Sequence, residues 1–344
     1  MTKRLNWVDV AKCFGIFAIY LGHCGTAAGN VYQFVFRFHV PLFFLLSGCM
    51  ETNGEALPIC KTALKTIKQI LIPWLIYCFA AVAVNVLAFN GSLSDIRMYL
   101  AAILRGTVRN DFFAGGLWFL PCLAVVKIMF SFLRKLKFKV VILLVCGAML
   151  WITQYRFPHN PLVQPSWMFN LDSAMYYIFY YAVGYVSFPY VCRLLEPKTQ
   201  IGKASLILSA AVAFCISVLL FFNRDGFLVI VCKAPYFGAF GYVLAALVII
   251  WLIFVAARLC QDVDIFKKVG RNTLHLCGGE YAVTLLFQCV LEMLGLRVNL
   301  TSPLVTVCYV ALMLVLGNYF FVPIAKQIIN WVMAIPEYLG AKQK

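Results

Sequence analysis

The sequence predicts an all-α membrane protein that crosses the bilayer about ten times, with both termini in the cytoplasm. Hydrophobic residues make up 63% of its 344 residues and charged residues only 12%, whereas soluble proteins carry about 25% charged residues. The apolar residues form runs close to membrane-spanning length. A β-barrel would instead show short segments of alternating hydrophobicity.

Apolar runs and the breaks between them predict ten spans in one transmembrane domain that covers residues 1–344, without a soluble domain, repeat or linker. The second span is short, so we expect it to be tilted or to begin within the membrane. The spans are residues 10–28, 37–50, 70–89, 115–133, 140–155, 172–192, 204–222, 235–257, 272–295 and 303–323.

The net charge of +16 has its cations in short clusters between the apolar runs. One set of alternate loops and ends carries 19 Lys and Arg residues and the other carries 8, which places both termini in the cytoplasm. We therefore interpret the charge as a topology signal beside anionic membrane lipids and expect no nucleic-acid partner. Some of the inner cations could also hold an anionic cofactor.

The fourteen cysteines are scattered singly, without a CxxC pair or a Cys/His cluster of metal-binding spacing. We expect these cysteines to be reduced and to act as small packing residues, and we expect no metal site. The basic start and first apolar run raise the alternative of a cleaved signal peptide. Because Asp9 and Lys12 interrupt the entry to this run, we favour an uncleaved first helix.

Lys12 and His23 are polar positions in the first predicted span. Eleven residues of helix rotate by about three turns plus roughly 20°, so these side chains share a face about 16 Å apart. Histidine is the usual general base; the alternative is a neutral imidazole that bonds between helices. Asp9 and Lys12 are helical neighbours at the cytoplasmic edge, where a simple ion pair is the alternative to ligand binding.

Arg37 and His39 open the second predicted span from the outer side. Arg37 either contacts substrate or extends to that surface. Pro41 breaks helical hydrogen bonding, and exposed backbone at this depth is tolerated mainly beside protein or a water-filled cavity. This pattern predicts a cavity near His39 and, through the short connector, near His23.

Three lysines with helical spacing, Lys61, Lys65 and Lys68, precede the third predicted span. They suit phosphate binding at the inner surface, and topology or lipid headgroups are the alternative.

Three further positions are candidates for substrate contact or catalysis. Trp118 in GGLWFLP is an interfacial anchor or a substrate contact. Asp172 caps the sixth span or faces the cavity. Glu280 is a carboxylate inside the ninth span, where a functional role is the default and a structural partner the alternative.

Two outer loops are long. The loop at residues 90–114 contains Ser94–Arg105, which predicts a short surface helix. The loop at residues 156–171, with three prolines and several aromatics, suits a lid or a carbohydrate-contacting surface, and anchoring to the interface is the alternative.

No Walker, paired GxGxxG, HExxH or GxSxG motif is present.

The pattern Asp9-x2-Lys12-x10-His23, followed by FHVPLFFLLSG at residues 38–48, resembles the opening of the acyltransferase family 3 membrane proteins. Within that family it is most similar to the branch named for fucose 4-O-acetylase. The resemblance continues through Lys68–Trp74, Leu117–Pro121 and Asp172–Gly184, and resumes at Gly270–Leu274.

The resemblance implies ten transmembrane helices and transfer of an acetyl group from acetyl-CoA to a hydroxyl of a cell-surface or lipid-linked carbohydrate. It also implies a location in the inner membrane of a bacterium. His23 occupies the family's essential histidine position, Lys12 its essential basic position and His39 its second histidine. The ninth span of the family often carries a histidine, where this chain has Glu280.

On this hypothesis His23 is a general base or a transient acetyl carrier, and His39 or Glu280 orients its ring. Asp9 lies three to four helical turns from His23, too far for that task. We therefore predict that it serves the CoA end with Lys12, Lys61, Lys65 and Lys68, and that Arg37, Trp118 and Asp172 contact the acceptor. The alternatives are a proton-coupled transporter or flippase for a sugar-linked or small anionic substrate, and a non-catalytic assembly factor.

Overall fold

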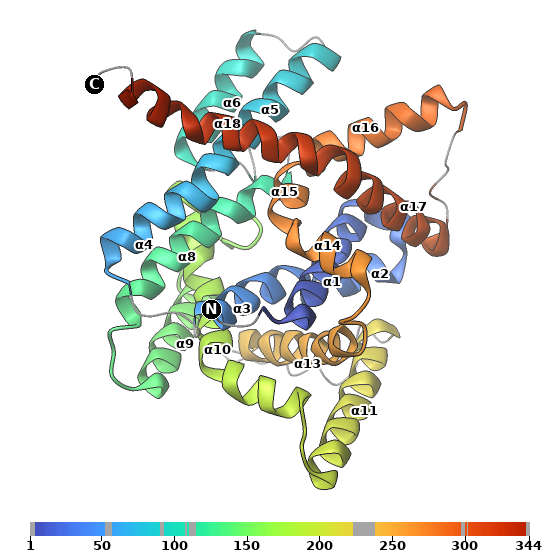
Figure 1. The fold of residues 1–344 in the computed structure, drawn as a ribbon. Helices are drawn as coiled ribbons and strands as arrows, with labels where there is room; N and C mark the ends of the chain where they lie inside the picture. The colour runs from blue at the N-terminus through green and yellow to red at the C-terminus, as the bar shows by residue number, and fades with distance from the viewer. Residues whose placement is uncertain are drawn as a thin grey trace.

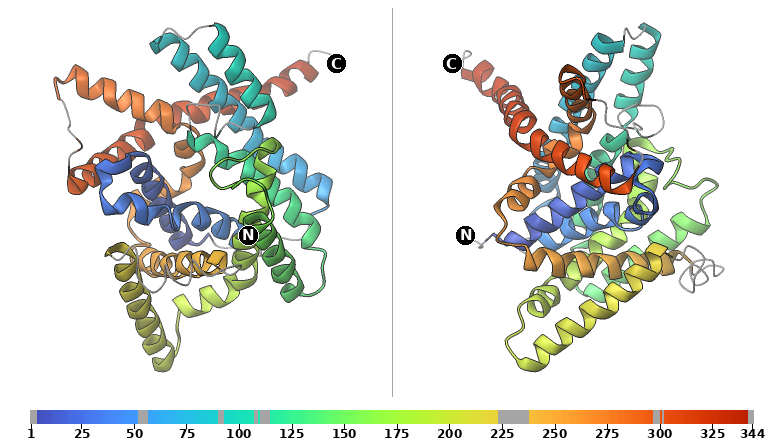
Figure 2. Two further views of the ribbon diagram at one scale, coloured as in Figure 1. Left: turned by 180° about the vertical axis from the view of Figure 1, so that it is seen from behind. Right: turned by 90° about the vertical axis from the view of Figure 1, so that its right-hand side faces the viewer.

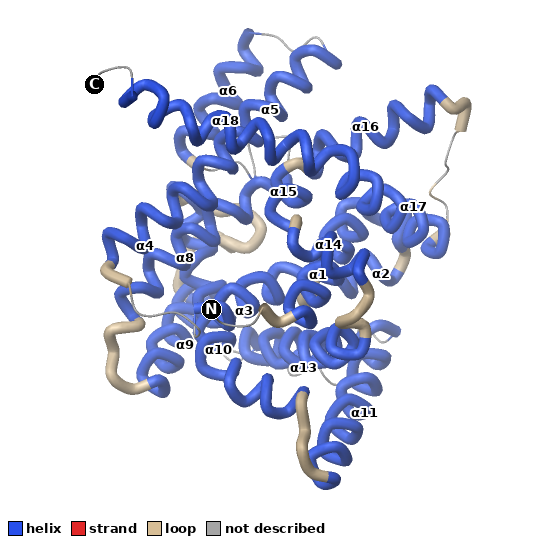
Figure 3. Tube along the Cα trace, viewed as in Figure 1, coloured by secondary structure: helices blue, strands red, loops and turns tan. Residues whose placement is uncertain are grey.

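Helices are the regular elements of this protein, as a computed structural model shows (Figure 1). The structure describes residues 4–51, 57–89, 93–106, 109, 115–222, 238–296, 300 and 302–341. Across these ranges no strand is present (Figure 3), which confirms the all-α prediction. The start of the predicted span 235–257 and most of the loop after Arg105 lie outside the described residues.

Seven helical stretches are long and apolar enough to cross a membrane, within the described ranges. The chain is therefore an integral membrane protein, while the number of crossings and the side of the termini stay predictions. A shorter apolar helix, α9, covers Lys139–Tyr155. The seven stretches are Asn30–Glu51, Ile59–Val86, Gly116–Leu133, Met168–Leu195, Gln200–Phe222, Gly238–Leu259 and Pro303–Ala334.

Helix α1 (Asn6–His23) lies at the centre of the bundle (Figure 2). It packs against α3 (His39–Glu51), α13 (Gly238–Leu259) and α14 (Asp264–Arg271). Most of its side chains are buried on all sides, as expected for a helix that is apolar around its whole circumference. A helix enclosed in this way holds its few polar side chains in fixed positions.

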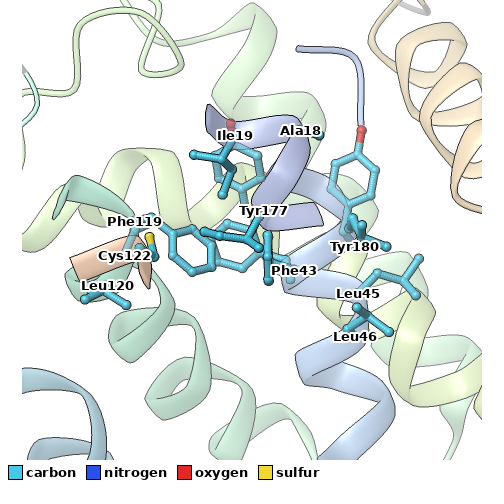
Figure 4. Packing of buried hydrophobic residues seen from close by; sticks show 14 of the residues in the cluster. Ala18, Ile19, Phe43, Leu45, Leu46, Phe119, Leu120, Cys122, Tyr177 and Tyr180 are labelled. Carbon is cyan, nitrogen blue, oxygen red and sulfur yellow. The ribbon is translucent and has the colours of Figure 1, made fainter. Parts of the chain in front are cut away.

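Helix α3 and helix α10 (Leu171–Leu195) approach each other closely at two glycines. A Cβ atom on Gly48 would collide with the carbonyl oxygen of Tyr181, and one on Gly184 with that of Leu45. Small residues at such contacts let membrane helices pack backbone to backbone. Aromatic rings fill the space beside this contact, around Phe43, Phe119 and Tyr177 (Figure 4).

Two helices contain a π turn directly before a proline. The turn Ile67–Leu71 joins α4 (Ile59–Thr66) to α5 (Ile72–Phe89), which contains Pro73. The turn Gly317–Phe321 joins α17 (Pro303–Leu316) to α18 (Val322–Ala341), which contains Pro323. Because proline lacks an N–H and its ring clashes with the preceding turn, a locally wider turn lets each helix continue.

The predicted ninth span is not one continuous helix. It consists of α15 (Thr273–Gly278) and α16 (Glu280–Met293), which meet at Gly279, and α14 precedes them. A Cβ atom on Gly279 would collide with the Phe321 ring, so this position requires glycine. The remaining helices are α2 (Asn30–Val35), α6 (Leu93–Arg105), α8 (Phe119–Leu133) and α11 (Gln200–Phe222).

The first predicted span ends earlier than residue 28, because α1 stops at His23. Gly25 adopts a φ of +60°, a left-handed conformation that favours glycine. This glycine turns the chain into the short helical connector Gly25–Ala28 and then into α2. Helix α6 confirms the predicted surface helix within 90–114.

Candidate active site

One face of α1 contacts the α14–α16 segment along most of its length. Asp9 binds Arg271 of α14, and the Tyr20 hydroxyl donates a hydrogen bond to the Leu276 carbonyl of α15 (2.9 Å). His23, at the end of α1, reaches Glu280, the first residue of α16. The two helical runs therefore lie side by side, α1 in blue and the α14–α16 run in orange in Figure 1.

His23 and Glu280 form a direct side-chain pair, in which Nδ1 of the imidazole contacts Oε1 of the carboxylate. Of the two partners predicted for His23, the structure brings Glu280 to it. The carboxylate lies in the first turn of α16, where the positive end of the helix dipole favours negative charge. Since Glu280 accepts the Nδ1 proton, Nε2 of His23 keeps its lone pair for another group.

Gly116 makes room for this carboxylate. A Cβ atom at position 116 would lie 2.5 Å from Oε2 of Glu280, which is closer than non-bonded atoms approach. Gly116 belongs to a short 3₁₀ turn, Gly115–Trp118, that leads into α8. One carboxylate oxygen therefore faces His23 and the other faces a backbone position without a side chain.

A cavity of about 460 Å³ opens at this pair. This volume falls in the range of small-molecule sites, and 39% of the His23 side chain is exposed. Aromatic side chains line part of the wall, mixed with small residues. The lining residues are Gly22, His23, Gly25, Tyr32, Phe36, Gly116, Leu117, Cys277, Gly278, Glu280, Tyr281 and Thr284.

Asp9 does not pair with Lys12, although the two are helical neighbours. Its buried carboxylate accepts hydrogen bonds from Arg4 (Nε at 2.7 Å, Nη2 at 3.0 Å) and from Nε of Arg271 (3.3 Å). The hydrogen bond to Asp9 raises the pKa of the Arg4 guanidinium. The backbone of Gly270 also packs against the Asp9 carbonyl, where a Cβ atom would collide. Asp9 thus joins α1 to α14, and the alternative of a simple Asp9–Lys12 ion pair is not what the structure shows.

Lys12 lies on the face of α1 that carries Asp9, Tyr20 and His23, as its spacing predicts. Its side chain is half-buried and makes no hydrogen bond or ion pair with any residue the structure describes. A cation left unpaired in such surroundings is costly. Lys12 is therefore free to meet an anionic group of a ligand.

His39 is buried behind the cavity and does not line it. Its Nδ1 donates a hydrogen bond to the Val35 carbonyl (2.6 Å), and its ring packs edge-on against Phe36, which does line the cavity. Pro41 falls in the first turn of α3, where a missing N–H leaves no broken bond. The exposed backbone expected at this proline is therefore absent from the described helix.

The other predicted contacts are dispersed. Arg37 is half-buried in the turn between α2 and α3 and is not among the cavity-lining residues. Lys61 and Lys65 project from α4 and Lys68 from the π turn after it; all three are exposed, and this segment packs on α8. Their contact with CoA stays a prediction.

Trp118 is buried rather than exposed at an interface. The Arg109 guanidinium lies 4.3 Å from the centre of its ring, and its carbonyl accepts a hydrogen bond from Asn170 (3.2 Å). The ring also packs against Tyr177. Its neighbour Leu117 lines the cavity instead, so Trp118 supports the wall from behind.

Asp172 is fully buried and holds the proline-rich loop 156–171. Its Oδ2 accepts hydrogen bonds from the backbone N–H groups of Ser166 (2.7 Å) and Trp167 (3.3 Å) and contacts Nε2 of His159 (3.0 Å). The expectation that Asp172 faces the cavity is not met, because the carboxylate folds back onto the loop. The exposed Trp167 and Met168 on this loop agree with the interface-anchoring alternative.

Sequence reasoning missed Gly116, Tyr32 and Phe36 as site residues. The double glycine in GGLW is a signal for close backbone approach, but nothing in the sequence says which side chain approaches. Tyr32 and Phe36 are four apart on and just beyond α2, with ring centres 5.1 Å apart. Among the described residues, no group of three His, Cys, Asp or Glu could hold a metal ion.

The His23–Glu280 pair at the cavity is suited to removing a proton from a hydroxyl group there.

A family model described as an acyltransferase domain matches residues 5–327. No curated protein and no solved structure matches the chain.

Proposed function

Because the chain belongs to the family of acyltransferase family 3 membrane proteins, with nearly all of its residues matched, we propose that it is an O-acetyltransferase that uses acetyl-CoA. The acceptor in this proposal is a hydroxyl of a cell-surface or lipid-linked carbohydrate, and the site of action is the inner membrane of a bacterium. The observation that carries the proposal is the His23–Glu280 pair at the open cavity.

In this mechanism His23 is the general base. Nε2 removes the proton of the acceptor hydroxyl as its oxygen attacks the thioester carbonyl, and Glu280 stabilises the imidazolium that forms. The C–S bond then breaks, and the departing CoA thiolate takes the proton back from Nε2. The products are the acetyl ester and CoA with a free thiol, and His23 returns to its starting state.

A variant of the same chemistry passes the acetyl group through His23. Nε2 attacks the thioester first and the C–S bond breaks to release the CoA thiolate; the acceptor hydroxyl then takes the acetyl group from the imidazole, and its proton passes to the thiolate. Both routes need Nε2 of His23 to be unprotonated and to face the substrate, and the bond between Nδ1 and Glu280 selects the tautomer of the neutral ring in which Nε2 carries the lone pair.

The cavity wall supports a carbohydrate acceptor. Tyr32, Phe36 and Tyr281 present aromatic side chains, and the apolar faces of sugar rings pack on such rings. Thr284, Tyr32 and Tyr281 add hydroxyl groups that can bond to sugar hydroxyls. Lys12, unpaired and on the His23 face of α1, is placed to meet an anionic part of the donor.

The direct test is release of CoA thiol by the purified protein in lipid nanodiscs. Acetyl-CoA is supplied with surface and lipid-linked glycans extracted from a strain that lacks the protein. We expect thiol release and glycan-bound acetyl groups, detected by mass spectrometry, only when both substrates are present. Uptake of a substrate that depends on a proton gradient and is indifferent to acetyl-CoA would contradict the proposal.

A further inference from the structure

A second cluster of positive charge lies at the far end of the α14–α16 run from the cavity. We call Arg4, Lys268, Arg271 and Lys326 the cationic face. Arg4 and Arg271 share the Asp9 carboxylate, and Lys268 is one helical turn before Arg271 on α14. Lys326 of α18 donates a hydrogen bond to Asn272 (2.6 Å), the residue after Arg271.

The side chains of the cationic face are held in place. Asn272 donates to Asn318 (2.7 Å) while it accepts from Lys326, and the Lys268 ammonium lies 5.8 Å from the centre of the Tyr319 ring. Arg271 is fixed by Asp9 yet keeps 45% of its side chain exposed. Cations that are already positioned lose less conformational freedom when a ligand binds.

The face keeps a surplus of positive charge. Asp9 is its buried carboxylate, shared between two arginines. The nearby Asp264 is bound by Lys267 (2.7 Å), and this hydrogen bond lowers the pKa of the Asp264 carboxyl. Lys268 and Lys326 form no ion pair with a described carboxylate. Unpaired cations at one surface attract phosphate groups.

The cationic face connects to the cavity through polar side chains. Lys12 lies on the face of α1 between Asp9 and His23, about 16 Å from His23 along the helix. At the level of α15, His275 pairs with the Tyr77 hydroxyl (2.7 Å). A ligand with phosphates at one end and a reactive carbonyl at the other end of a long arm matches this arrangement.

The lysines on and after α4 differ in this respect. Lys61, Lys65 and Lys68 are exposed on a segment that packs against α8, and among the described residues no hydrogen bond or ion pair joins them to the α14–α16 run. Their exposure agrees with the interpretation of such lysine clusters as signals of membrane topology. The cationic face therefore differs from the α4 lysines in its position, because it lies at one end of the α14–α16 run that leads to His23.

We propose that the cationic face binds the phosphate groups of the soluble acyl donor, so that the thioester end reaches His23; the proposal rests on the proposed function for the identity of that donor. The 3′-phosphate and the pyrophosphate of CoA supply the anionic groups. Lipid headgroups carry the same chemistry, so the test must separate the two sources.

The test measures CoA binding rather than turnover. The full-length protein is placed in nanodiscs of neutral lipid, with a parallel set that contains anionic lipid, and affinity for free CoA and for dephospho-CoA is determined from the shift in thermal unfolding. We expect Lys268→Gln and Lys326→Gln each to weaken CoA binding about tenfold, whereas Lys268→Arg and Lys326→Arg retain it. Lys198→Gln and Lys203→Gln, which remove exposed lysines outside the face, serve as matched controls with unchanged affinity.

The outcomes separate this proposal from the proposed function. If CoA binding depends on Lys268 and Lys326 but no acetyl transfer occurs, the phosphate site is supported and the proposed acetyltransferase function is contradicted. Transfer with wild-type CoA affinity in both Gln variants, or affinity lost instead in Lys65→Gln and Lys68→Gln, overturns the phosphate site. Stabilisation through these lysines by anionic lipid alone, with no response to CoA, overturns the soluble donor as the source.

Discussion

A carboxylate is paired with cationic or imidazole side chains at each end of α1, but the two pairs have different roles. At the start, the Asp9 carboxylate is buried and both of its oxygens accept hydrogen bonds from arginines, while the Gly270 backbone packs against the Asp9 main-chain carbonyl. At the end, Glu280 holds one nitrogen of His23 and leaves the other free beside a cavity. A saturated carboxylate fastens helices together, whereas a partly satisfied pair at an open cavity can move a proton.

Removal of the base gives the largest expected effect. His23→Ala should lower acetyl transfer about 10³-fold, because the acceptor hydroxyl loses the imidazole that takes its proton. The measurement is turnover at saturating acetyl-CoA, with CoA affinity measured in parallel and expected to be unchanged. His159→Gln, on the proline-rich loop 156–171, is the control. Near-full turnover in His23→Ala would rule out the mechanism.

Glu280→Gln should lower turnover about 100-fold while the KM for acetyl-CoA stays close to wild type. Glutamine has the same shape but cannot stabilise the imidazolium, so a loss at kcat reports the charge rather than the packing. Steady-state kinetics with varied acetyl-CoA separate the two parameters. If the Gln variant turns over at the wild-type rate, Glu280 only fills space.

Gly116→Ala should lower turnover about tenfold with little change in thermal stability. The added methyl group forces the Glu280 carboxylate to move, and small misplacements at a reacting centre cost rate rather than folding. Gly147→Ala is the matched control, since its Cβ would meet Phe179 at an ordinary 3.5 Å. Equal kinetics in the two variants would show that Glu280 has room to spare.

Asp9→Asn should have the smallest effect on turnover and a clear effect on stability. The free energy of unfolding should fall by about 2 kcal/mol, because three charge-assisted hydrogen bonds from two arginines weaken, although both arginines remain partly solvated. Thermal unfolding in nanodiscs measures the change, and Asp264→Asn, on the exposed side of α14, should leave it unaltered. Activity per folded molecule that falls with stability would assign Asp9 a role in the reaction.

Much of the framework could be predicted from sequence. Runs of apolar residues and few charges gave the all-α membrane fold, which the structure confirms. Helical periodicity placed Lys12 and His23 on one face of α1. The α14–α16 segment that packs on this face supplies Glu280 to His23 and Arg271 to Asp9. The family assignment is also confirmed by the match to residues 5–327, while its fucose 4-O-acetylase branch stays a prediction.

Other parts could not be read from sequence. An ion pair between Asp9 and Lys12 was the alternative to ligand binding because i,i+3 neighbours are close on a helix, but Arg4 and Arg271 bind the Asp9 carboxylate instead. Asp172 was expected at a cap or in the cavity; its Oδ1 accepts the backbone N–H of Ser173 in the first turn of α10, and its Oδ2 binds the loop before the helix. Trp118 was expected at the interface or against substrate, and it is buried beside Arg109. Each partner was chosen by packing between segments whose approach no local pattern encodes.

The sequence by itself therefore determined that the chain is a helical membrane protein whose first helix presents a lysine and a histidine on one face, since composition and the 3.6-residue period are local properties. Only the tertiary structure decided that Glu280, 257 residues from His23, orients it. The break at Gly279 starts a new helix at Glu280, and the missing side chain at Gly116 leaves its carboxylate space. Both depend on helices that meet only in the folded bundle.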